Sequence, residues 1–486
     1  TELNRIASTT QFNGMNLLDG SFSNVELQVG ADVGQKVMFG VANADNATLG
    51  SFQLTSTVET VGTESTNSAG ALTQAGNDTH ASAKSALDAL YNSAADYTLK
   101  GSFGTKTASV NAGADARDVA AAFNAVSNTT GVNATAITRT RIEHITGADT
   151  FTFTLQGKST TSSTVTFTIA DVDDISAAKD AINAVSGSTG IIAKMVDGDK
   201  SKIDLVQEEG YDIIIGDVTA SSTNTAVTVD TSGPPASAAG ATLTAGAAHG
   251  FKVGDIVTYG KGGTVLTNLT DGAEYRVDSV ASTTTFTLTA TDGTAHTYGG
   301  GGGHASDTFT RLNGIQFKAM TASNTDGTLS TGATATLNTN NDSTAFVGQV
   351  TLNSHKNFTV ASGNAANHFA TDTSAQTTDL NTVGSIDMKT VIGSSRALSI
   401  IDSALQMIDQ SRSQMGALNN RLESTVDNLS NITVKTEASL ARIMDADFAQ
   451  ETTELSKSQV LSQAATAMLA QANQQPQNVL RLLQAG

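Results

Sequence analysis

The C-terminal stretch from Arg396 to Leu483 constrains this chain most, because it predicts a long helix with an apolar stripe. One series of apolar residues recurs at intervals of seven: Ile401, Ile408, Met415, Leu422 and Leu429. A second series fills most of the alternate positions: Leu398, Leu405, Leu418, Val426 and Leu440. A stripe of this kind on an otherwise polar helix needs a partner helix to cover it. Residues 397–440 alone would form a rod of about 65 Å at 1.5 Å per residue, which indicates bundling and assembly.

The last segment of the chain extends this pattern with many small side chains. One helical face gathers Val460, Leu461, Ala464, Ala467, Met468, Leu469, Ala470 and Ala472. Small side chains let neighbouring helices approach closely. Pro476 is expected to interrupt the helix. Beyond it, Val479, Leu480, Leu482 and Leu483 form a terminal apolar patch, which marks an interaction site.

Composition and charge exclude several classes of function. The 486-residue chain has a formal net charge of −19, which argues against nucleic-acid binding because that requires clustered Lys and Arg. Cys is absent, so neither a disulfide nor a thiolate metal site can form. No apolar run of about 18 residues occurs, so membrane insertion is not expected. The length favours several domains, and the abundance of Gly, Ser, Thr, Ala and Asn favours extended β structure.

The chain begins with a helical pattern rather than with a signal peptide. Leu3, Ile6 and Ala7 have helical spacing, and residues 25–29 alternate as in a strand, with residues 37–39 as the candidate partner strand. We expect the sequence to be a truncated or processed piece of a longer protein.

The middle of the chain contains an internal repeat. Residues 123–132 recur as residues 182–191, at an offset of 59 positions. Each copy predicts a short helix that ends near Gly131 or Gly190 and is followed by a strand. Further strands are predicted at residues 151–155, 165–169, 203–205, 213–215, 256–259, 275–277, 286–288, 314–318 and 346–352.

Shifts in composition divide the chain into five predicted parts. Pro234-Pro235 is the best linker candidate, and Gly299–Gly303 is expected to be a flexible joint. The parts are an inner helical and β-hairpin domain (1–44 and 385–440), a first outer region with two related α+β units at about 100–220 (45–232), a β-rich inserted module (233–303), a β-rich return segment (304–384) and a terminal coiled-coil helix (441–486).

The sequence offers no constellation that favours an enzyme. Its seven His residues are scattered, and no two have the spacing of a helical metal site. Asp171, Asp173 and Asp174 resemble part of a calcium loop but lack its Gly and terminal Glu, so a solvated turn is expected. Gly299–Gly303 is not followed by Lys and Ser or Thr, which excludes a phosphate loop. We therefore expect no catalytic residue, no cofactor and no metal.

Motifs in both terminal regions resemble those of bacterial flagellin. On the N-terminal side they are Glu2-Leu3-Asn4-Arg5-Ile6-Ala7, Phe12-Asn13-Gly14 and Leu17-Leu18-Asp19-Gly20. On the C-terminal side they are Ala446-Asp447-Phe448-Ala449 and Ala470-Gln471-Ala472-Asn473-Gln474-Gln475-Pro476-Gln477-Asn478-Val479-Leu480. The resemblance covers roughly residues 1–40 and 385–483, and the repeated Asn-Ala-Val-Ser…Thr-Gly units resemble a module often inserted in flagellins. The family's N-terminal helices, which pair with the C-terminal ones, are absent from this sequence.

The resemblance implies an architecture, a location and partners. Residues 385–440 would form the long helix of the inner domain, residues from about 441 would form one strand of the filament's innermost coiled-coil tube, and the inserts would project outward. Secretion through type III export would place the protein in the extracellular flagellum. Its partners would be other copies in a helical filament, an export chaperone, and the filament cap and junction proteins, with glycans as further candidate ligands.

The sequence therefore predicts a multidomain α plus β protein with long coiled-coil-like terminal helices and inserted β-rich and α+β outer domains. We expect a non-enzymatic, self-assembling subunit of the motility filament. The alternatives are a hook–filament junction protein, which shares the terminal helices, and a cell-surface protein that binds glycans through the middle β units. The residues predicted to pack between subunits, called the apolar stripe below, are Leu398, Ile401, Leu405, Ile408, Met415, Leu418, Leu422, Val426, Leu429, Leu440, Val460, Leu461, Met468, Leu469, Val479, Leu480, Leu482 and Leu483.

A polypeptide of residues 1–486 alone is expected not to polymerise under conditions that support filament growth of a full-length flagellin. An uncovered amphipathic helix is marginal in water, because packing supplies most helical stability. Hydrogen exchange should show little protection beyond about residue 441, and sedimentation should report a monomer. Long filaments grown from this polypeptide alone would contradict the expectation.

Overall fold

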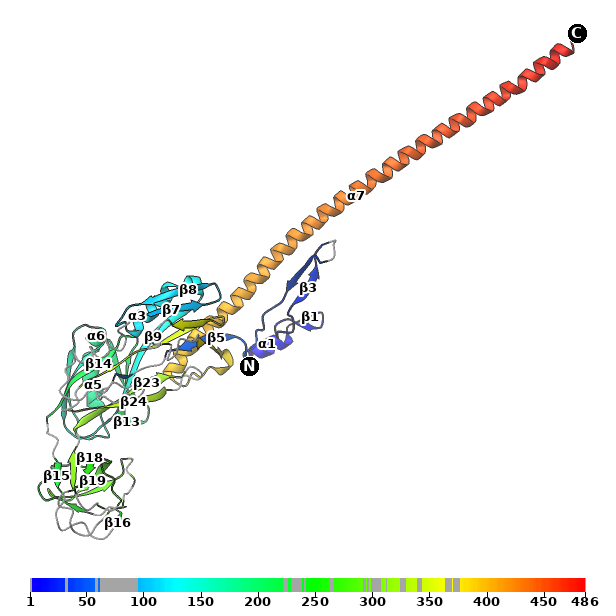
Figure 1. The fold of residues 1–486 in the computed structure, drawn as a ribbon. Helices are drawn as coiled ribbons and strands as arrows, with labels where there is room; N and C mark the ends of the chain where they lie inside the picture. The colour runs from blue at the N-terminus through cyan, green and yellow to red at the C-terminus, as the bar shows by residue number, and fades with distance from the viewer. Residues whose placement is uncertain are drawn as a thin grey trace. The chain divides into compact units, whose positions relative to one another are not determined.

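The computed structural model shows a mixed α/β protein with one very long helix (Figure 1). Two compact units, treated separately below, divide the chain: Thr1–Asp45 with Ile408–Gly486, and Asn46–Met407. The described residues are 2–30, 34–56, 60–61, 95–221, 226–228, 238–239, 242–262, 266, 268–291, 294, 297–298, 307–311, 313–323, 329–338, 343–362, 369 and 376–485.

The N-terminal part of the first unit is a short helix followed by two small hairpins. Its elements are α1 (Glu2–Thr9), β1 (Gln11–Phe12), β2 (Met15–Asn16), β3 (Val25–Gln28) and β4 (Lys36–Phe39). β3 and β4 pair antiparallel with Val25 opposite Phe39, which confirms the predicted strand and its partner. Asn13 and Gly14 turn the first hairpin with φ values of 51° and 79°, a backbone conformation that Asn and Gly tolerate best.

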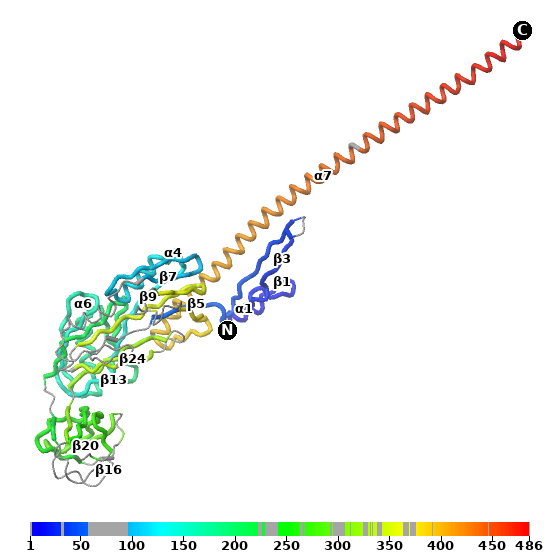
Figure 2. The backbone as a smooth tube through the Cα atoms, viewed as in Figure 1, coloured from blue at the N-terminus to red at the C-terminus, as the bar shows by residue number. Residues whose placement is uncertain are grey.

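Helix α7 (Val391–Leu483) contains 93 residues and runs from the second unit into the first. Figure 2 shows its backbone as one continuous tube from orange to red. The predicted interruption at Pro476 is wrong, because the helix continues past this residue to Leu483. A helical proline leaves the carbonyl four residues earlier without its amide partner. Here that carbonyl belongs to Ala472, which is exposed, so water can replace the lost hydrogen bond.

Three antiparallel sheets form the body of the second unit. The central sheet has the order β12-β13-β9-β26-β5-β29, with β23 also paired to β9 and β24 to β23. Its strands are β12 (Ile191–Val196), β13 (Asp199–Gln207), β9 (Asn133–Ile145), β26 (Gln349–Ser354), β5 (Gly50–Thr55), β29 (Asp379–Thr382), β23 (Gly314–Ala322) and β24 (Leu329–Asn338). A 3-10 turn, η1 (Val383–Ser385), follows β29.

The other two sheets are built from strands that alternate along the sequence with those of the central sheet. The five-stranded sheet runs in the order β11 (Ser163–Thr168), β10 (Thr150–Gln156), β14 (Ile213–Ala220), β25 (Thr344–Phe346) and β6 (Thr60–Val61). The four-stranded sheet runs in the order β28 (Gln376–Thr377), β27 (Thr359–Ser362), β7 (Ala95–Lys100) and β8 (Thr105–Val110). Among the described residues of this unit, the helices are α3 (Ala116–Ala125), α4 (Ser127–Thr130), α5 (Ser176–Ala184), α6 (Ser186–Thr189) and the start of α7.

The chain passes from one sheet to another at Gly348. The single strand predicted at residues 346–352 is wrong, because β25 ends at Phe346 in the five-stranded sheet and β26 begins at Gln349 in the central sheet. The crossing is crowded: a Cβ atom on Gly348 would lie 2.5 Å from Thr138 Oγ1 and 2.6 Å from Ala116 Cβ. Only glycine fits this crossing without displacing its neighbours.

Two apolar clusters form the core of this body. In the first, α5 packs with Phe151, Phe153, Phe317 and Phe346. In the second, α3 contributes Phe123, which lies beside Tyr97 and Phe369 with ring centroids 5.3 Å and 5.4 Å away.

The internal repeat is visible as two matching sets of contacts. Asn124 Nδ2 donates to Ala134 O and Asn124 Oδ1 accepts from Ala134 N, at 2.9 Å and 2.8 Å. Asn183 makes the same two bonds to Ala193, also at 2.9 Å and 2.8 Å. Each of these Asn side chains therefore joins its helix to the strand that follows. The short helices end at Gly131 and Gly190, whose φ values are 73° and 69°, as the sequence pattern predicted.

A separate β module lies within the second unit. Its main sheet runs in the order β15 (Ala226–Thr228), β22 (Thr308–Arg311), β18 (Ile256–Gly260), β19 (Glu274–Val280), β20 (Thr285–Thr289) and β17 (Leu243–Thr244), and a small second sheet pairs β16 (Ala238–Ala239) with β21 (Thr297–Tyr298). Tyr259, Phe286 and Phe309 lie in its own apolar core. The predicted linker Pro234-Pro235 and the predicted joint Gly299–Gly303 lie outside the described residues.

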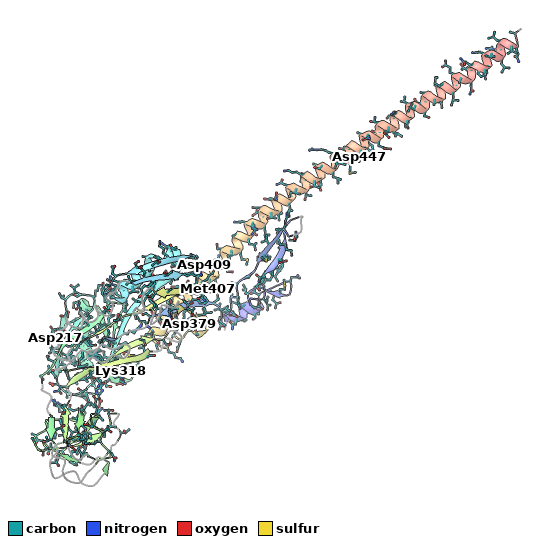
Figure 3. All side chains as sticks on the ribbon, in the orientation of Figure 1. Asp217, Lys318, Asp379, Met407, Asp409 and Asp447 are labelled. Atoms are coloured by element: carbon teal, nitrogen blue, oxygen red, sulfur yellow. The ribbon has the colours of Figure 1, made fainter. Side chains whose placement is uncertain are left out.

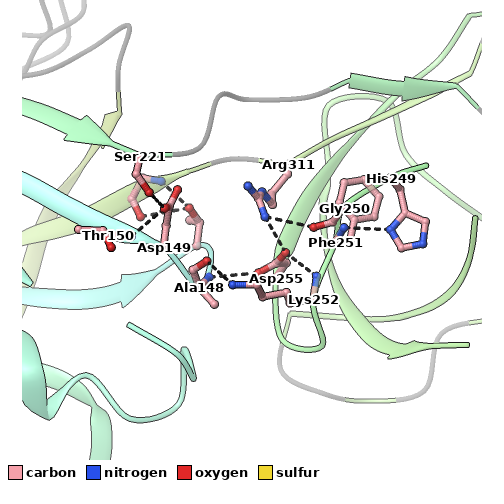
Figure 4. A network of polar contacts seen from close by, with 12 residues as sticks. Ala148, Asp149, Thr150, Ser221, His249, Gly250, Phe251, Lys252, Asp255 and Arg311 are labelled. Atoms are coloured by element: carbon pink, nitrogen blue, oxygen red, sulfur yellow. Dashed lines mark hydrogen bonds and ion pairs between the residues drawn. The ribbon is translucent and has the colours of Figure 1, made fainter. Parts of the chain in front are cut away.

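A buried carboxylate joins this module to the body (Figure 4). Asp255 is fully buried, and its carboxylate accepts hydrogen bonds from Ala148 N at 3.2 Å and Lys252 N at 2.8 Å. The guanidinium of Arg311 lies 3.5 Å from the same carboxylate, and Lys252 Nζ donates to Ala148 O at 3.2 Å. A buried charge is stable only with partners of this kind, so Asp255 fixes the module at the end of β9.

Asn183→Ala is expected to destabilise the second unit by about 1–3 kcal/mol, because two hydrogen bonds to the following strand are lost. The matched control is Asn128→Ala, which changes an exposed Asn of α4 for which no side-chain hydrogen bond is recorded. Urea denaturation of both variants measures the difference. Equal midpoints for Asn183→Ala and Asn128→Ala would show that these bonds contribute nothing.

Candidate subunit-packing surface

The first turns of α7 are fixed to the second unit by one face of the helix. Ala397, Ile400 and Ala404 are only 3%, 2% and 5% exposed. Steps of three and four residues place them in line along the helix. Sequence reasoning missed this face, although its spacing was visible, because two of its three members are alanines with little hydrophobic signal.

Polar side chains complete the attachment of α7 to the central sheet. Gln53 of β5 accepts hydrogen bonds from Asn381 Nδ2 at 2.7 Å and from Arg396 Nε at 3.2 Å. Its own amide nitrogen donates to Ser399 Oγ at 3.3 Å. Ser399 Oγ in turn donates to Asn353 Oδ1 of β26 at 3.2 Å. Through Gln53 and Asn353, the strands β5, β29 and β26 hold the beginning of the helix.

The predicted apolar stripe begins one residue away from this buried face. Leu398, Ile401 and Leu405 each follow a buried residue directly, and they are 63%, 39% and 53% exposed. A step of one residue turns a helix by about 100°. The second unit therefore uses a neighbouring face of α7 and leaves the beginning of the stripe uncovered.

In the first unit, the stripe is mostly half-buried as far as Leu429 and exposed beyond it. Ile408, Met415, Leu418, Leu422 and Leu429 are half-buried. Val426 and Leu440, in contrast, are 64% and 56% exposed. Figure 3 labels Met407 and Asp409 near this stretch and Asp447 farther along the helix, where side chains point outward on all sides.

The end of α7 carries the most exposed part of the stripe. The exposures run from 57% to 78% for Val460, Leu461, Met468, Leu469, Val479, Leu480, Leu482 and Leu483. Residues 458–480 contain no charged side chain, so nothing ionic opposes burial of this stretch. Alternating small and large apolar residues suit close contact between helices, in which the side chains of one helix fill holes on the next.

The structure adds exposed apolar residues that the prediction omitted. On the same helix these are Ile432, Val434, Ile443, Met444, Phe448 and Leu455, all at least 45% exposed. Steps of four residues lead from Leu440 to Met444 and on to Phe448, which is a signal that periodicity analysis could have found. A large exposed apolar area on a helix typically marks an interaction site.

The acidic residues and helices that the structure describes were also compared with metal sites and membrane spans. No group of three or more His, Asp or Glu among the described residues could hold a metal ion. Asp171 accepts from Asp173 N at 3.0 Å within a turn, and Asp173 pairs with Arg276. No helix in the described part of the chain has the length and apolarity needed to cross a membrane.

Two stretches of the chain match models of known families. Residues 398–483 match the bacterial flagellin C-terminal helical region, and residues 150–206 match the flagellin hook IN motif. The first match covers all the residues of the apolar stripe, and the second covers the second copy of the internal repeat.

Curated flagellins share substantial identity with part of this chain. B-type flagellin of Pseudomonas aeruginosa is 44% identical over 140 residues, which are 29% of this chain and 28% of the relative. Flagellin A of Vibrio cholerae is 52% identical over 103 residues, which are 21% of this chain and 27% of the relative. The matched stretches thus span little more than a quarter of these relatives. With the two family models, they confirm the predicted resemblance to bacterial flagellin.

The solved structures that match include the flagellar cap protein FliD from Helicobacter pylori. It has a TM-score of 0.15 and 8% identity, over 53% of this chain and 80% of that chain. Agreement at this level supports no conclusion about the fold.

Leu422→Asp is expected to weaken the helical assembly more than any single charge placed in the second unit. Burying a leucine contributes about 1.5–3 kcal/mol, and an unpaired buried carboxylate costs more. The measurement is thermal melting of the helical circular-dichroism signal of the full-length protein, under conditions in which it polymerises. Asn420→Asp, on the opposite side of the same turn and exposed, is the matched control. Unchanged melting of Leu422→Asp would show that Leu422 is not in a packed seam.

Proposed function

We propose that this chain, whose C-terminal helix and IN motif are those of bacterial flagellins, is a structural subunit of the flagellar filament. The observation that carries the proposal is the apolar stripe of α7, which continues from Leu398 to Leu483 on a single helix and is exposed at most of its residues. A helix with this surface is stable only against other helices.

Assembly would proceed by packing of α7 against helices of other copies or of the same polypeptide. Each leucine that becomes buried contributes about 1.5–3 kcal/mol, and the stripe offers many such residues along one helix. Part of this gain is offset by the loss of side-chain freedom and of independent motion of the subunits. The repeated small contributions nevertheless favour a long, regular contact over a single compact interface.

The second unit would form the outer part of the subunit. It has its own apolar clusters and its own β module, so it can bury its surface without contacts from other subunits. We infer a non-enzymatic role for the whole chain. In this arrangement, the predicted outer domains at 45–232, 233–303 and 304–384 project from the filament, and residues 441–486 form part of its coiled-coil interior.

The proposal includes a location and partners. The subunit would be exported and would function outside the cell, in the flagellum, where its main partner is another copy of itself. An export chaperone, the filament cap and the junction proteins are further partners that the flagellin resemblance implies. Glycans remain candidate ligands of the outer units.

Electron microscopy tests the proposal on the complete protein from which this sequence derives. Under polymerising conditions it should form long helical filaments, and Leu480→Asp should shorten or abolish them, because Leu480 is exposed in the chain and buried in the proposed contact. Gln477→Asp, on an exposed polar position of the same turn, is the control for an added charge. Short caps instead of filaments would favour a hook–filament junction protein and would refute the filament role.

A further inference from the structure

A pocket of about 410 Å³ lies where the first turns of α7 cover the central sheet. This volume falls within the range of roughly 300–1,000 Å³ that is usual for small-molecule sites. Strands β9, β26 and β5 form its floor, and residues of α7 form one wall. All of its lining residues belong to the second unit.

The two faces of this sheet differ sharply in polarity. On one face, Leu54, Val350 and Leu352 lie in the apolar cluster with α3. The opposite face, which forms the floor of the pocket, carries alternate residues of the same strands, and apart from Ile137 these are polar: Gln53, Thr55, Thr135, Arg139, Gln349, Thr351 and Asn353. A sheet face that is covered by a helix is normally apolar, because burial of apolar surface holds the two layers together. The polar face under α7 holds the helix through Gln53 and Asn353, and it leaves a polar pocket beside these contacts.

Arg139 is the side chain in this pocket that the fold does not explain. Its guanidinium makes no hydrogen bond and no ion pair within 4.0 Å in the described part of the chain. The guanidinium of Arg141, on the same strand, donates from Nε and Nη2 to the carboxylate of Asp204 at 2.5 Å and 3.1 Å. Burial lowers the pKa of Arg139 to about 10, and the more distant carboxylates of Asp204 and Glu208 only partly oppose this effect. Arg139 is half-buried, and a partly desolvated guanidinium without a protein partner is stabilised by an oxyanion that accepts two parallel hydrogen bonds.

The charges of the lining residues indicate which valence of anion the pocket would balance. Arg139 and Arg396 are positive and Glu208 is negative, so the lining has a formal charge of +1. A monoanion balances this charge, whereas a dianionic phosphate would meet the carboxylate of Glu208. The hydroxyl groups of Thr55, Thr351 and Ser395 also line the pocket and can bond to hydroxyl groups of a ligand.

We propose that this pocket binds a small hydroxylated monocarboxylate, such as an acidic monosaccharide, with its carboxylate on the guanidinium of Arg139. The proposal does not depend on filament assembly. An Asp or Glu side chain of a second copy could also supply the carboxylate that binds Arg139, and the experiment below distinguishes it from a free monocarboxylate.

Isothermal titration calorimetry of the complete chain with glucuronate, glucose and inorganic phosphate tests the proposal. Glucuronate should bind in the millimolar range or tighter, and glucose and phosphate at least tenfold more weakly. Arg139→Gln should weaken glucuronate binding at least tenfold. Arg117→Gln, an exposed arginine at the start of α3, is the control and should bind glucuronate normally. Equal affinity for glucuronate and glucose, or unchanged affinity in Arg139→Gln, would overturn the proposal.

Thermal melting distinguishes a binding residue from a structural one. Arg139→Gln should melt at the same temperature as the parent chain or higher, because the half-buried guanidinium has no protein partner that its removal would leave unpaired. Arg141→Gln should melt lower, because it leaves the Asp204 carboxylate without its guanidinium. If Arg139→Gln does not fold, the proposal fails, since Arg139 would then be structural. A second copy would be the source of the carboxylate if the parent chain self-associates in sedimentation, the Arg139→Gln variant does not, and the parent binds no glucuronate. That result would also overturn the proposal.

Discussion

The pairing of β5 with β29 is the constraint on which the second unit depends. The two strands lie more than 320 positions apart in the sequence, yet Gly50 pairs with Thr382, and Val383 N donates to Leu49 O at 2.8 Å. The approach at Gly50 is so close that a Cβ atom would lie 2.1 Å from Asn381 O, so any larger residue would separate the strands. Because the chain enters and leaves this unit on neighbouring strands, the residues between them can change without moving either connection.

The same strands set where α7 begins. β29 leads through η1 into the helix, and the short connection leaves α7 beside the face of β5 and β26 that carries Gln53 and Asn353. The opposite face is closed by α3 and its apolar cluster. The central sheet therefore has one apolar layer that stabilises the unit and one polar layer that orients the helix and leaves the pocket at Arg139. Only about four turns of α7 are attached in this way, and the rest of the helix belongs to the first unit.

Local patterns explain what could be predicted from the sequence. Asn124 and Asn183, with Gly131 and Gly190, repeat at a fixed offset and make the same contacts, so the repeat was visible before its structure. The apolar stripe was visible because large side chains recur at helical spacing. The pairing of β9 with β26 could not be predicted, because it joins segments about 200 positions apart and leaves no local sequence pattern.

The predicted interruption at Pro476 was wrong because helix propensity includes the cost of the lost hydrogen bond but not the water that can replace it. No sequence pattern singled out Arg139, because only the folded sheet shows that its guanidinium lies in a pocket without a protein partner.

The two faces of α7 differ in the kind of contact that each one supports. Ala397 and Ala404, on either side of the buried Ile400, present little side-chain volume to the sheet, and the hydroxyl group of Ser399 is within reach of Gln53. Leu398, Ile401 and Leu405, one residue farther along, present large side chains that no such short approach could accommodate. A helix that docked on the sheet through its leucines would bury its own assembly surface. By docking through Ala397, Ile400 and Ala404, the chain fixes one end of α7 and leaves the adjacent face exposed, as the proposed packing against another helix requires.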